Sequence, residues 1–196
     1  MSFIPDFKVG LLNAWIFTIF IIFVYAVPGN LINKKAMRRF YCFTMYFETS
    51  SKRTGTAARF LQIIYPIVGI YSIFLPIKIG TTWFYAGLII FIIAFIWSII
   101  THICFANSKL NDPVTGGTYR YSRNPTYFGQ FLLFVGISIA CISWIVLLLV
   151  IIYILTANYL INLEEDYCLE KYGDAYKKYM KRTPKWIGIQ KSEKKQ

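Results

Sequence analysis

Residues 114 to 129 read Val114-Thr-Gly-Gly-Thr-Tyr119-Arg-Tyr-Ser-Arg123-Asn-Pro125-Thr-Tyr127-Phe-Gly129, and they separate two long apolar runs. The stretch combines positive charge, aromatic rings and the backbone breakers glycine and proline. A second polar cluster, Glu164-Glu165-Asp166, closes the next apolar run. Ionisable groups are costly beside hydrocarbon and usually have a function there. The two clusters therefore predict a polar constellation at one face of a membrane.

The chain is too apolar for an ordinary soluble domain, with 57% hydrophobic residues among 196 and a mean hydropathy of +0.51. We expect an all-α integral membrane bundle of about five transmembrane helices, forming a single domain over residues 1–196. The fourth run is short and the fifth follows it almost at once, which predicts a tight helical hairpin. The second run contains Pro66 and Pro76, either of which would kink a helix. The five runs are Gly10–Val27, Phe60–Ile77, Trp83–Phe105, Phe128–Ile142 and Trp144–Leu163.

Beyond the fifth run, the helix is expected to continue from Glu164 to Tyr172 and to stop at Gly173. Asp174 can then cap a short amphipathic helix, Ala175 to Lys181. The sequence predicts that the aromatic face of this cytoplasmic C-terminal helix turns toward the membrane. That face consists of Tyr176, Tyr179 and Met180.

The basic residues predict the orientation, because short loops rich in lysine and arginine stay on the cytoplasmic side. They concentrate in the loop from Asn33 to Arg59, in the loop from Asn107 to Tyr127 and in the C-terminal tail, which leaves only Lys8 and Lys78 for the opposite face. We therefore expect the N-terminus outside and the C-terminus and active site in the cytoplasm. The net charge of +12 would also suit nucleic acid, but these residues adjoin apolar runs, so membrane lipids are the simpler partner.

Several polar residues are predicted to meet at the cytoplasmic interface, where a water-soluble cofactor could reach a lipid-soluble substrate. Asn158, Asn162 and Glu165 share one helical stripe, which would be costly against lipid and is expected to face a cavity. His102, the one histidine of the chain, lies near the end of the third run. The four cysteines include no C-x-x-C pair, so no metal site is predicted.

The ordered motifs of the C-terminal half resemble the isoprenylcysteine carboxyl methyltransferase and phospholipid methyltransferase superfamily. They run from Gly117 to Gly129, through Glu164-Glu165, to Tyr172-Gly173-Asp-Ala-Tyr176-Lys-Lys-Tyr179 and Thr183-Pro184. The resemblance implies an integral membrane enzyme that uses S-adenosylmethionine from the cytosolic side. The usual signature of that superfamily is Arg-His-Pro-x-Tyr, and here Asn124 replaces the histidine.

The resemblance also implies which residues hold the cofactor, within residues 107–184. The cofactor would be wrapped by Asn111 to Val114, which precede the glycine turn at Gly116-Gly117, by Tyr119, and by the turn from Asn124 to Tyr127. Glu164 would contact it from the other side. The implied cofactor residues are Asn111, Asp112, Pro113, Val114, Tyr119, Asn124, Pro125, Thr126, Tyr127 and Glu164.

The charges of S-adenosylmethionine make such roles reasonable, because a partly desolvated pocket needs acidic and basic partners. Glu164 or Glu165 can take the ammonium, while Arg123 or Arg120 can take the carboxylate or a substrate headgroup. An amine acceptor must also lose a proton, to Glu165, to water bound by Asn162, to solvent or to His102, although a hydrogen-bonded interfacial histidine is the more common situation. The catalytic candidates are Arg123, Glu165 and His102, and the substrate candidates are Asn158 and Asn162.

The acceptor expected from these residues is a phospholipid-type amine or another lipid-embedded molecule. The isoprenylcysteine enzymes carry an arginine one turn before the cofactor glutamate, where this chain has Leu160, so a prenylcysteine carboxylate is disfavoured. A small hydrophobic thiol stays open. Sterol reductases share a related module but need more spans, and a non-catalytic membrane subunit or transporter component would carry its binding stripe near mid-membrane. The sequence leaves the oligomeric state open.

Overall fold

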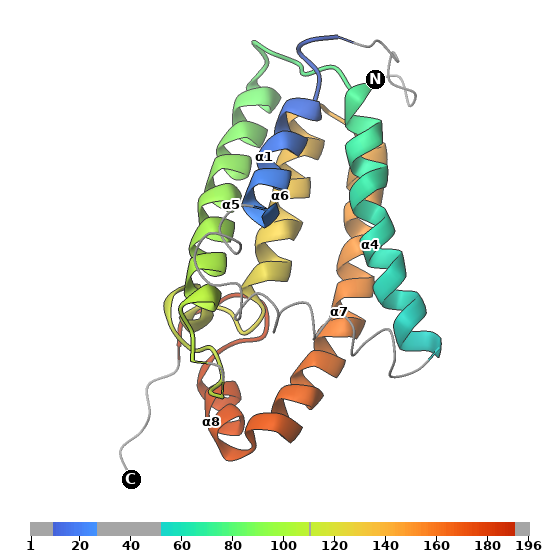
Figure 1. Ribbon diagram of the computed structural model, residues 1–196. Helices are drawn as coiled ribbons and strands as arrows, with labels where there is room; N and C mark the ends of the chain where they lie inside the picture. Colours follow the sequence, from blue (N-terminus) through green and yellow to red (C-terminus); the bar gives the residue numbers. More distant parts are fainter. Residues whose placement is uncertain (1–9, 27–51, 110, 191–196) are drawn as a thin grey trace.

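The computed structural model describes residues 10–26, 52–109 and 111–190, and in these residues the only regular elements are helices (Figure 1). The longer helices lie side by side as a bundle, and the short C-terminal helix lies at one end of it. The expected all-α fold is confirmed. In chain order the elements are α1 (Trp15–Ala26), α4 (Lys52–Ile73), α5 (Thr82–Ala106), the 3₁₀ helix η1 (Gly117–Arg120), α6 (Pro125–Ala140), α7 (Trp144–Tyr172) and α8 (Asp174–Arg182).

Three of the helices, α4, α5 and α7, are long and apolar enough to cross a membrane. Apolar α1 and α6 are shorter, with 12 and 16 residues. At about 1.5 Å per residue, 16 residues reach roughly 24 Å, less than a hydrocarbon core of about 30 Å. The membrane bundle is thus confirmed, while the count of five spans stays a prediction. Part of the basic loop from Asn33 to Arg59 and Lys8 lie outside the described residues.

The segments before α1 and after α4 are not helical. Instead, their backbones form hydrogen bonds with each other. Ala14 N donates to Leu75 O over 2.9 Å, and Ile77 N donates to Leu12 O over 3.1 Å. These contacts explain why the first helix begins at Trp15 rather than Gly10, and why the second ends at Ile73, before Pro76. Pro66 lies inside α4 without ending it.

Helices α5 and α6 make the closest contact of the bundle, through two glycines. A Cβ atom at Gly87 would lie 2.3 Å from Ala140 N, and one at Gly136 would lie 2.9 Å from Phe91 N. Small residues allow helix backbones to approach this closely in membranes. The role of Gly136 and Ala140 is therefore to let α6 pack closely against α5.

Replacing Gly87 by alanine is expected to destabilise the bundle by about 1 to 3 kcal/mol, because the new methyl group would meet backbone atoms that cannot move aside. The matched control is Gly69→Ala in α4, where the nearest atom to a new Cβ, Thr18 Cγ2, is 3.5 Å away. Thermal unfolding in detergent would check the prediction. A Gly87→Ala midpoint no lower than that of Gly69→Ala would contradict it.

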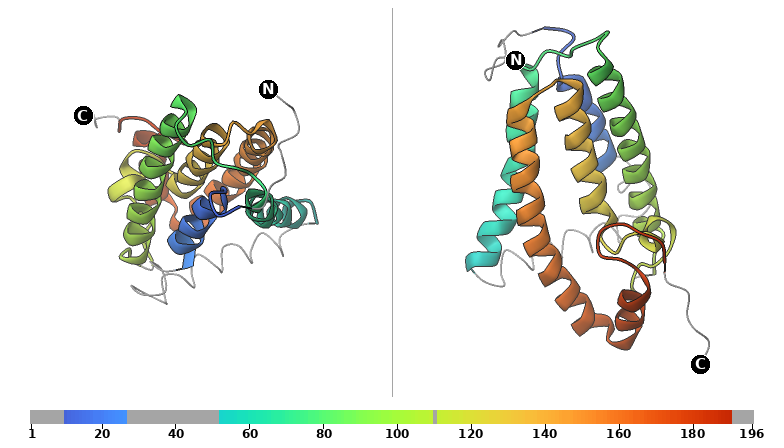
Figure 2. Two further views of the ribbon diagram at one scale, coloured as in Figure 1. Left: turned by 90° about the horizontal axis from the view of Figure 1, so that it is seen from above. Right: turned by 180° about the vertical axis from the view of Figure 1, so that it is seen from behind.

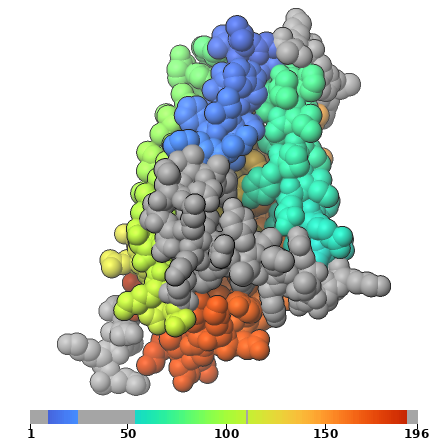
Figure 3. Space-filling view, viewed as in Figure 1, coloured from blue at the N-terminus to red at the C-terminus, as the bar shows by residue number. Residues whose placement is uncertain are grey.

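The hairpin between α6 and α7 is as tight as predicted. Ile142 has a φ of 54°, and the Ser143 hydroxyl caps α7 by accepting from Val146 N. Helix α7 then runs for 29 residues, about 43 Å, and ends at Gly173, as expected. Its apolar part ends at Leu163, and Glu164 begins a charged part. The end of α7 extends past the ends of α5 and α6 and lies with α8 at the lower end of the molecule (Figures 1 and 3).

Helix α8 departs from the prediction in two respects. Its N-cap is Gly173 rather than Asp174, which lies in the first turn. Tyr176 and Tyr179 do not turn toward the membrane: they are buried in the protein, in a cluster with Tyr119. The pattern of α8 predicted an aromatic face correctly, but protein and membrane bury such a face equally well.

Candidate functional site

The polar residues collect at one end of the bundle, which we call the polar end. It consists of residues 107–109 and 111–124, the part of α7 from Glu164 onward, α8 and residues 183–190, and Figure 2 shows these segments together from behind. The predicted convergence of the loop and the acidic cluster is confirmed as a geometric fact.

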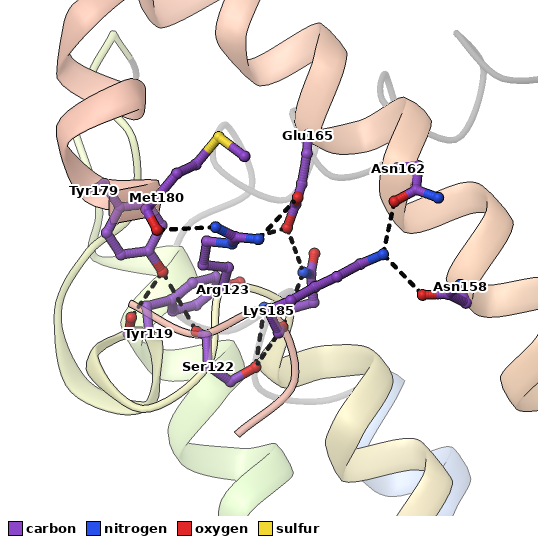
Figure 4. A network of polar contacts seen from close by, with 10 residues as sticks. Tyr119, Ser122, Arg123, Asn158, Asn162, Glu165, Tyr179, Met180 and Lys185 are labelled. Carbon is purple, nitrogen blue, oxygen red and sulfur yellow. Dashed lines mark hydrogen bonds and ion pairs between the residues drawn. The ribbon is translucent and has the colours of Figure 1, made fainter. Parts of the chain in front are cut away.

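Arg123 and Glu165 form a two-pronged ion pair at the centre of the polar end (Figure 4). Arg123 Nε donates to Glu165 Oε1 over 2.9 Å, and Nη2 donates to Oε2 over 3.1 Å. The guanidinium also donates from Nη1 to the Met180 carbonyl over 3.0 Å. The two side chains are only 12% and 8% exposed. The pair therefore links the loop, α7 and α8, and Glu165 is occupied by a cation from its own chain.

Asn124 completes the coordination of Glu165 and ties in the segment after α8. Its Nδ2 donates to Glu165 Oε1 over 3.0 Å and to the Lys185 carbonyl over 3.1 Å. The backbone extends this docking, since Arg123 N donates to Pro184 O and Gly188 N donates to Tyr121 O, each over 2.9 Å. The amide at position 124 is thus a neutral, pH-independent donor where the superfamily signature has a histidine.

The tyrosine cluster holds the glycine turn in place. The Tyr179 hydroxyl donates to the Tyr119 carbonyl over 2.7 Å, with Ser122 O at 3.4 Å (Figure 4). Gly117 has a φ of 59°, and a Cβ there would lie 2.1 Å from Cys104 Sγ. The turn is consequently fixed against both α5 and α8.

A cavity of about 120 Å³ lies between the loop, the charged part of α7 and α8. Its wall is mostly aromatic and aliphatic, with one carboxylate and two cationic side chains. The lining residues are Phe105, Pro113, Val114, Tyr119, Arg123, Asn124, Glu164, Tyr167, Cys168, Lys171, Tyr172, Tyr176 and Tyr179.

Glu164 is the lining residue with unused bonding capacity. Its Oε2 atom is buried and accepts no hydrogen bond. Burial raises the pKa of this carboxyl to about 8, while a hydrogen bond with Tyr127 lowers it and the charge of Glu165 raises it. A buried acceptor without a partner is costly, so Glu164 is prepared for a cation or a donor from a ligand.

The structure brings together part of the predicted cofactor set. Pro113, Val114, Tyr119, Asn124 and Glu164 line the cavity. The remaining five members of the set do not line it: Tyr127 contacts Glu164 from outside, Asn111 and Asp112 are exposed, and Pro125 and Thr126 begin α6.

Of the catalytic candidates, Arg123 lines the cavity, whereas Glu165 and His102 do not. His102 is buried in α5, where its Nδ1 atom is 2.7 Å from the Ser98 carbonyl oxygen. The hydrogen-bonded histidine is therefore the situation observed, and a catalytic role for His102 stays a prediction.

The two asparagines of the predicted stripe lie at the surface of the protein, whereas Glu165 is buried. Asn158 and Asn162 are exposed and do not line the cavity. Their side-chain oxygens accept from Lys185 Nζ, over 2.8 Å and 2.6 Å. Sequence reasoning did not single out this lysine.

Sequence reasoning also missed the α7 wall of the cavity beyond Glu164. Tyr167, Cys168 and Lys171 follow Glu164 at helical spacings of three, four and seven, a pattern that would have revealed them. The Lys171 ammonium lies 5.5 Å and 5.4 Å from the ring centroids of Tyr167 and Tyr172. No group of three or more metal-binding side chains gathers within the ranges that the structure describes.

Comparison with known protein families identifies a match to this chain. The model of the phospholipid methyltransferase family matches residues 77–175, which are 99 of the 196 residues. The match includes α5, α6 and α7, and with them most of the polar end. The searches of curated proteins and of solved structures found no match.

Proposed function

Because the chain belongs to the phospholipid methyltransferase family and is thus a membrane methyltransferase, we propose that it transfers a methyl group from S-adenosylmethionine to a lipid-embedded amine. The observation that carries the proposal is the buried, unbonded Oε2 of Glu164 in an otherwise aromatic cavity. A ligand that presents an ammonium there would satisfy both the hydrogen bond and the charge.

The other cavity residues fit the rest of such a ligand. The aromatic rings offer faces to a flat base and to a cation. Lys171 supports the binding of a carboxylate better than Arg123, because Glu165 already neutralises the arginine. When bound, S-adenosylmethionine supplies a methyl group on a positively charged sulfur, which the transfer leaves uncharged. The task of the chain is then to orient the two reactants and to exclude water.

An amine acceptor is supported by the position where the isoprenylcysteine enzymes carry an arginine. Leu160 is 3% exposed and packs in the apolar core of the bundle. No cation from this position is available for an acceptor carboxylate. A side approach to the site, between helices and from the bilayer, accords with the apolar part of α7 that leads up to Glu164.

The proposed orientation places the polar end in the cytoplasm. Its basic residues support this, since Lys109, Arg120, Lys171 and those of α8 belong to the polar end. Lys78 belongs to the connection between α4 and α5, which Figure 1 shows at the opposite end of the bundle.

Methyl transfer from radiolabelled S-adenosylmethionine into membrane extracts tests the function. The label is expected in the organic phase, bound stably as an N-methyl group, when wild-type protein is added. Label in base-labile esters, or on soluble molecules alone, would contradict a lipid amine. Stabilisation of the protein by a nicotinamide cofactor, with none by S-adenosylmethionine or its demethylated product, would contradict the methyl donor.

Cofactor affinity is expected to depend on pH through Glu164. With its pKa near 8, this carboxyl is mostly protonated at neutral pH, and an ammonium prefers the ionised form. Binding should therefore release a proton, and affinity should rise about tenfold as the pH goes from about 6 to about 7. Calorimetry in buffers of different ionisation enthalpy would measure both. Glu164→Gln, which cannot titrate, should lose the slope, and a slope that persists would contradict the assignment.

A further inference from the structure

The side chain of Lys185 is held by two neutral amide groups. Its ammonium donates to the side-chain oxygens of Asn158 and Asn162, over 2.8 Å and 2.6 Å. An ammonium has three N–H donors. The two asparagines therefore fix the direction of Lys185 and leave one donor for a further acceptor (Figure 4).

Both partners of Lys185 are neutral, so its positive charge is not compensated. Within the described residues, no carboxylate lies within ion-pair distance of the Lys185 ammonium. The nearby carboxylate of Glu165 already accepts from Arg123 and Asn124. The site has the donors and the charge for an anion, and none of the described residues supplies one.

The position of this charge selects an anion at a membrane surface. Asn158 and Asn162 are exposed and lie in the last turns of the apolar part of α7, which ends at Leu163. A cation beside hydrocarbon is costly, and lipid phosphates are the anions at that depth. Lys185 thus lies where the headgroup of a bilayer lipid would be.

The same lysine is linked to the cavity through one residue. Asn124, which lines the cavity, donates to the Lys185 carbonyl. Figure 4 shows the side chain of Lys185 leading away from Met180 and Tyr179, toward the exposed face of α7. An amphiphile with its phosphate at Lys185 would lie beside the cavity, with its tail along α7.

From this placement we propose that Lys185, oriented by Asn158 and Asn162, binds the phosphate of the acceptor and so selects phosphate-bearing amines over amines without phosphate. This inference rests on the proposed function and extends it to a specificity-determining residue. It also gives the two asparagines a different role from direct contact with the substrate, because they position the cation.

The main test compares Lys185→Gln with wild-type protein on two acceptors, phosphatidylethanolamine and a long-chain primary amine without phosphate. Losing the cation should raise KM for phosphatidylethanolamine about tenfold, leave kcat nearly unchanged and leave the phosphate-free amine unaffected. Lys185→Arg should retain the affinity. Lys178→Gln, an exposed lysine of α8, is the control for loss of one charge. An unchanged KM, or an equal rise for both acceptors, would overturn the proposal.

Asn162→Asp separates phosphate binding from docking of the segment after α8. The new carboxylate keeps the contact with Lys185 and neutralises it. If Lys185 served only to hold the segment, this variant should be as active as wild type and at least as stable. We expect unchanged thermal unfolding together with a KM for phosphatidylethanolamine raised as in Lys185→Gln, and a wild-type KM would overturn the proposal.

A binding measurement keeps the test independent of methyl transfer. Phosphatidic acid in micelles should raise the unfolding temperature of the wild-type protein more than diacylglycerol does, and Lys185→Gln should lose the difference. Inorganic phosphate is the parallel probe, and an equal effect from it would assign the site to a soluble phosphate rather than a lipid. If the protein transfers no methyl group, the proposed function fails, while this difference still decides whether Lys185 binds phosphate. No difference between wild type and Lys185→Gln would overturn it.

Discussion

Replacing Glu164 by alanine is expected to abolish or strongly weaken the binding of S-adenosylmethionine. The cavity has a single carboxylate, and its Oε2 atom has no other partner. An ammonium left in a partly buried site without it loses a charge-assisted hydrogen bond of about 1.5 to 3 kcal/mol, a fall in affinity of roughly 10-fold to 150-fold. Isothermal titration of the purified protein would measure the effect.

Two further variants make the result specific. Glu164→Gln keeps the shape of the side chain and an acceptor for Tyr127 but removes the charge, and it should approach the alanine variant. Asp166→Ala removes an exposed acidic residue two positions along the same helix and should bind like wild type. Equal, small effects at positions 164 and 166 would indicate that the acidic cluster is only a solvated extension of α7.

Replacing Glu165 by alanine is expected to produce the largest loss of stability, about 3 to 5 kcal/mol. Arg123 would remain buried with a full charge and with only the Met180 carbonyl as a partner. Loop, α7 and α8 would lose their common link, so cofactor binding should weaken as a secondary result. Thermal unfolding in detergent would show a lowered midpoint.

A double-mutant cycle would measure the interaction free energy between Arg123 and Glu165. Arg123→Met combined with Glu165→Met leaves no unpaired charge and should recover much of the stability that either single substitution loses. Strictly additive losses would mean that the two side chains act independently, contrary to the geometry of the ion pair.

The helices could be predicted from the sequence because hydropathy and helix-ending residues act locally. The third run, Trp83–Phe105, became α5 (Thr82–Ala106), and Gly173 ended α7 as its conformational freedom indicates. The predicted helix ends were wrong where contacts with residues distant in the sequence determine them. The first helix begins at Trp15 because residues before it bond to a segment far along the chain, and no local pattern contains that information.

The candidate site shows the same division. Residue types and motif order pointed to Glu164, Val114 and Tyr119, which line one cavity. The pairing of charges could not be predicted, since Glu165 was as good a partner for a ligand as for Arg123 until the fold brought them to 2.9 Å. The role of Lys185 could not be predicted, because no local pattern distinguishes one lysine from the others in a basic tail.

The docking of Pro184 and Gly188 onto the loop has a consequence for biogenesis. These residues are made after every helix of the bundle, and they bond to backbone atoms of Arg123 and Tyr121 that were synthesised about 60 residues earlier. A nascent chain whose helices have already entered the membrane still lacks this closing segment. The loop at residues 121 to 123 is therefore expected to reach its final, docked conformation only late in synthesis, once residues 184 to 188 have been made.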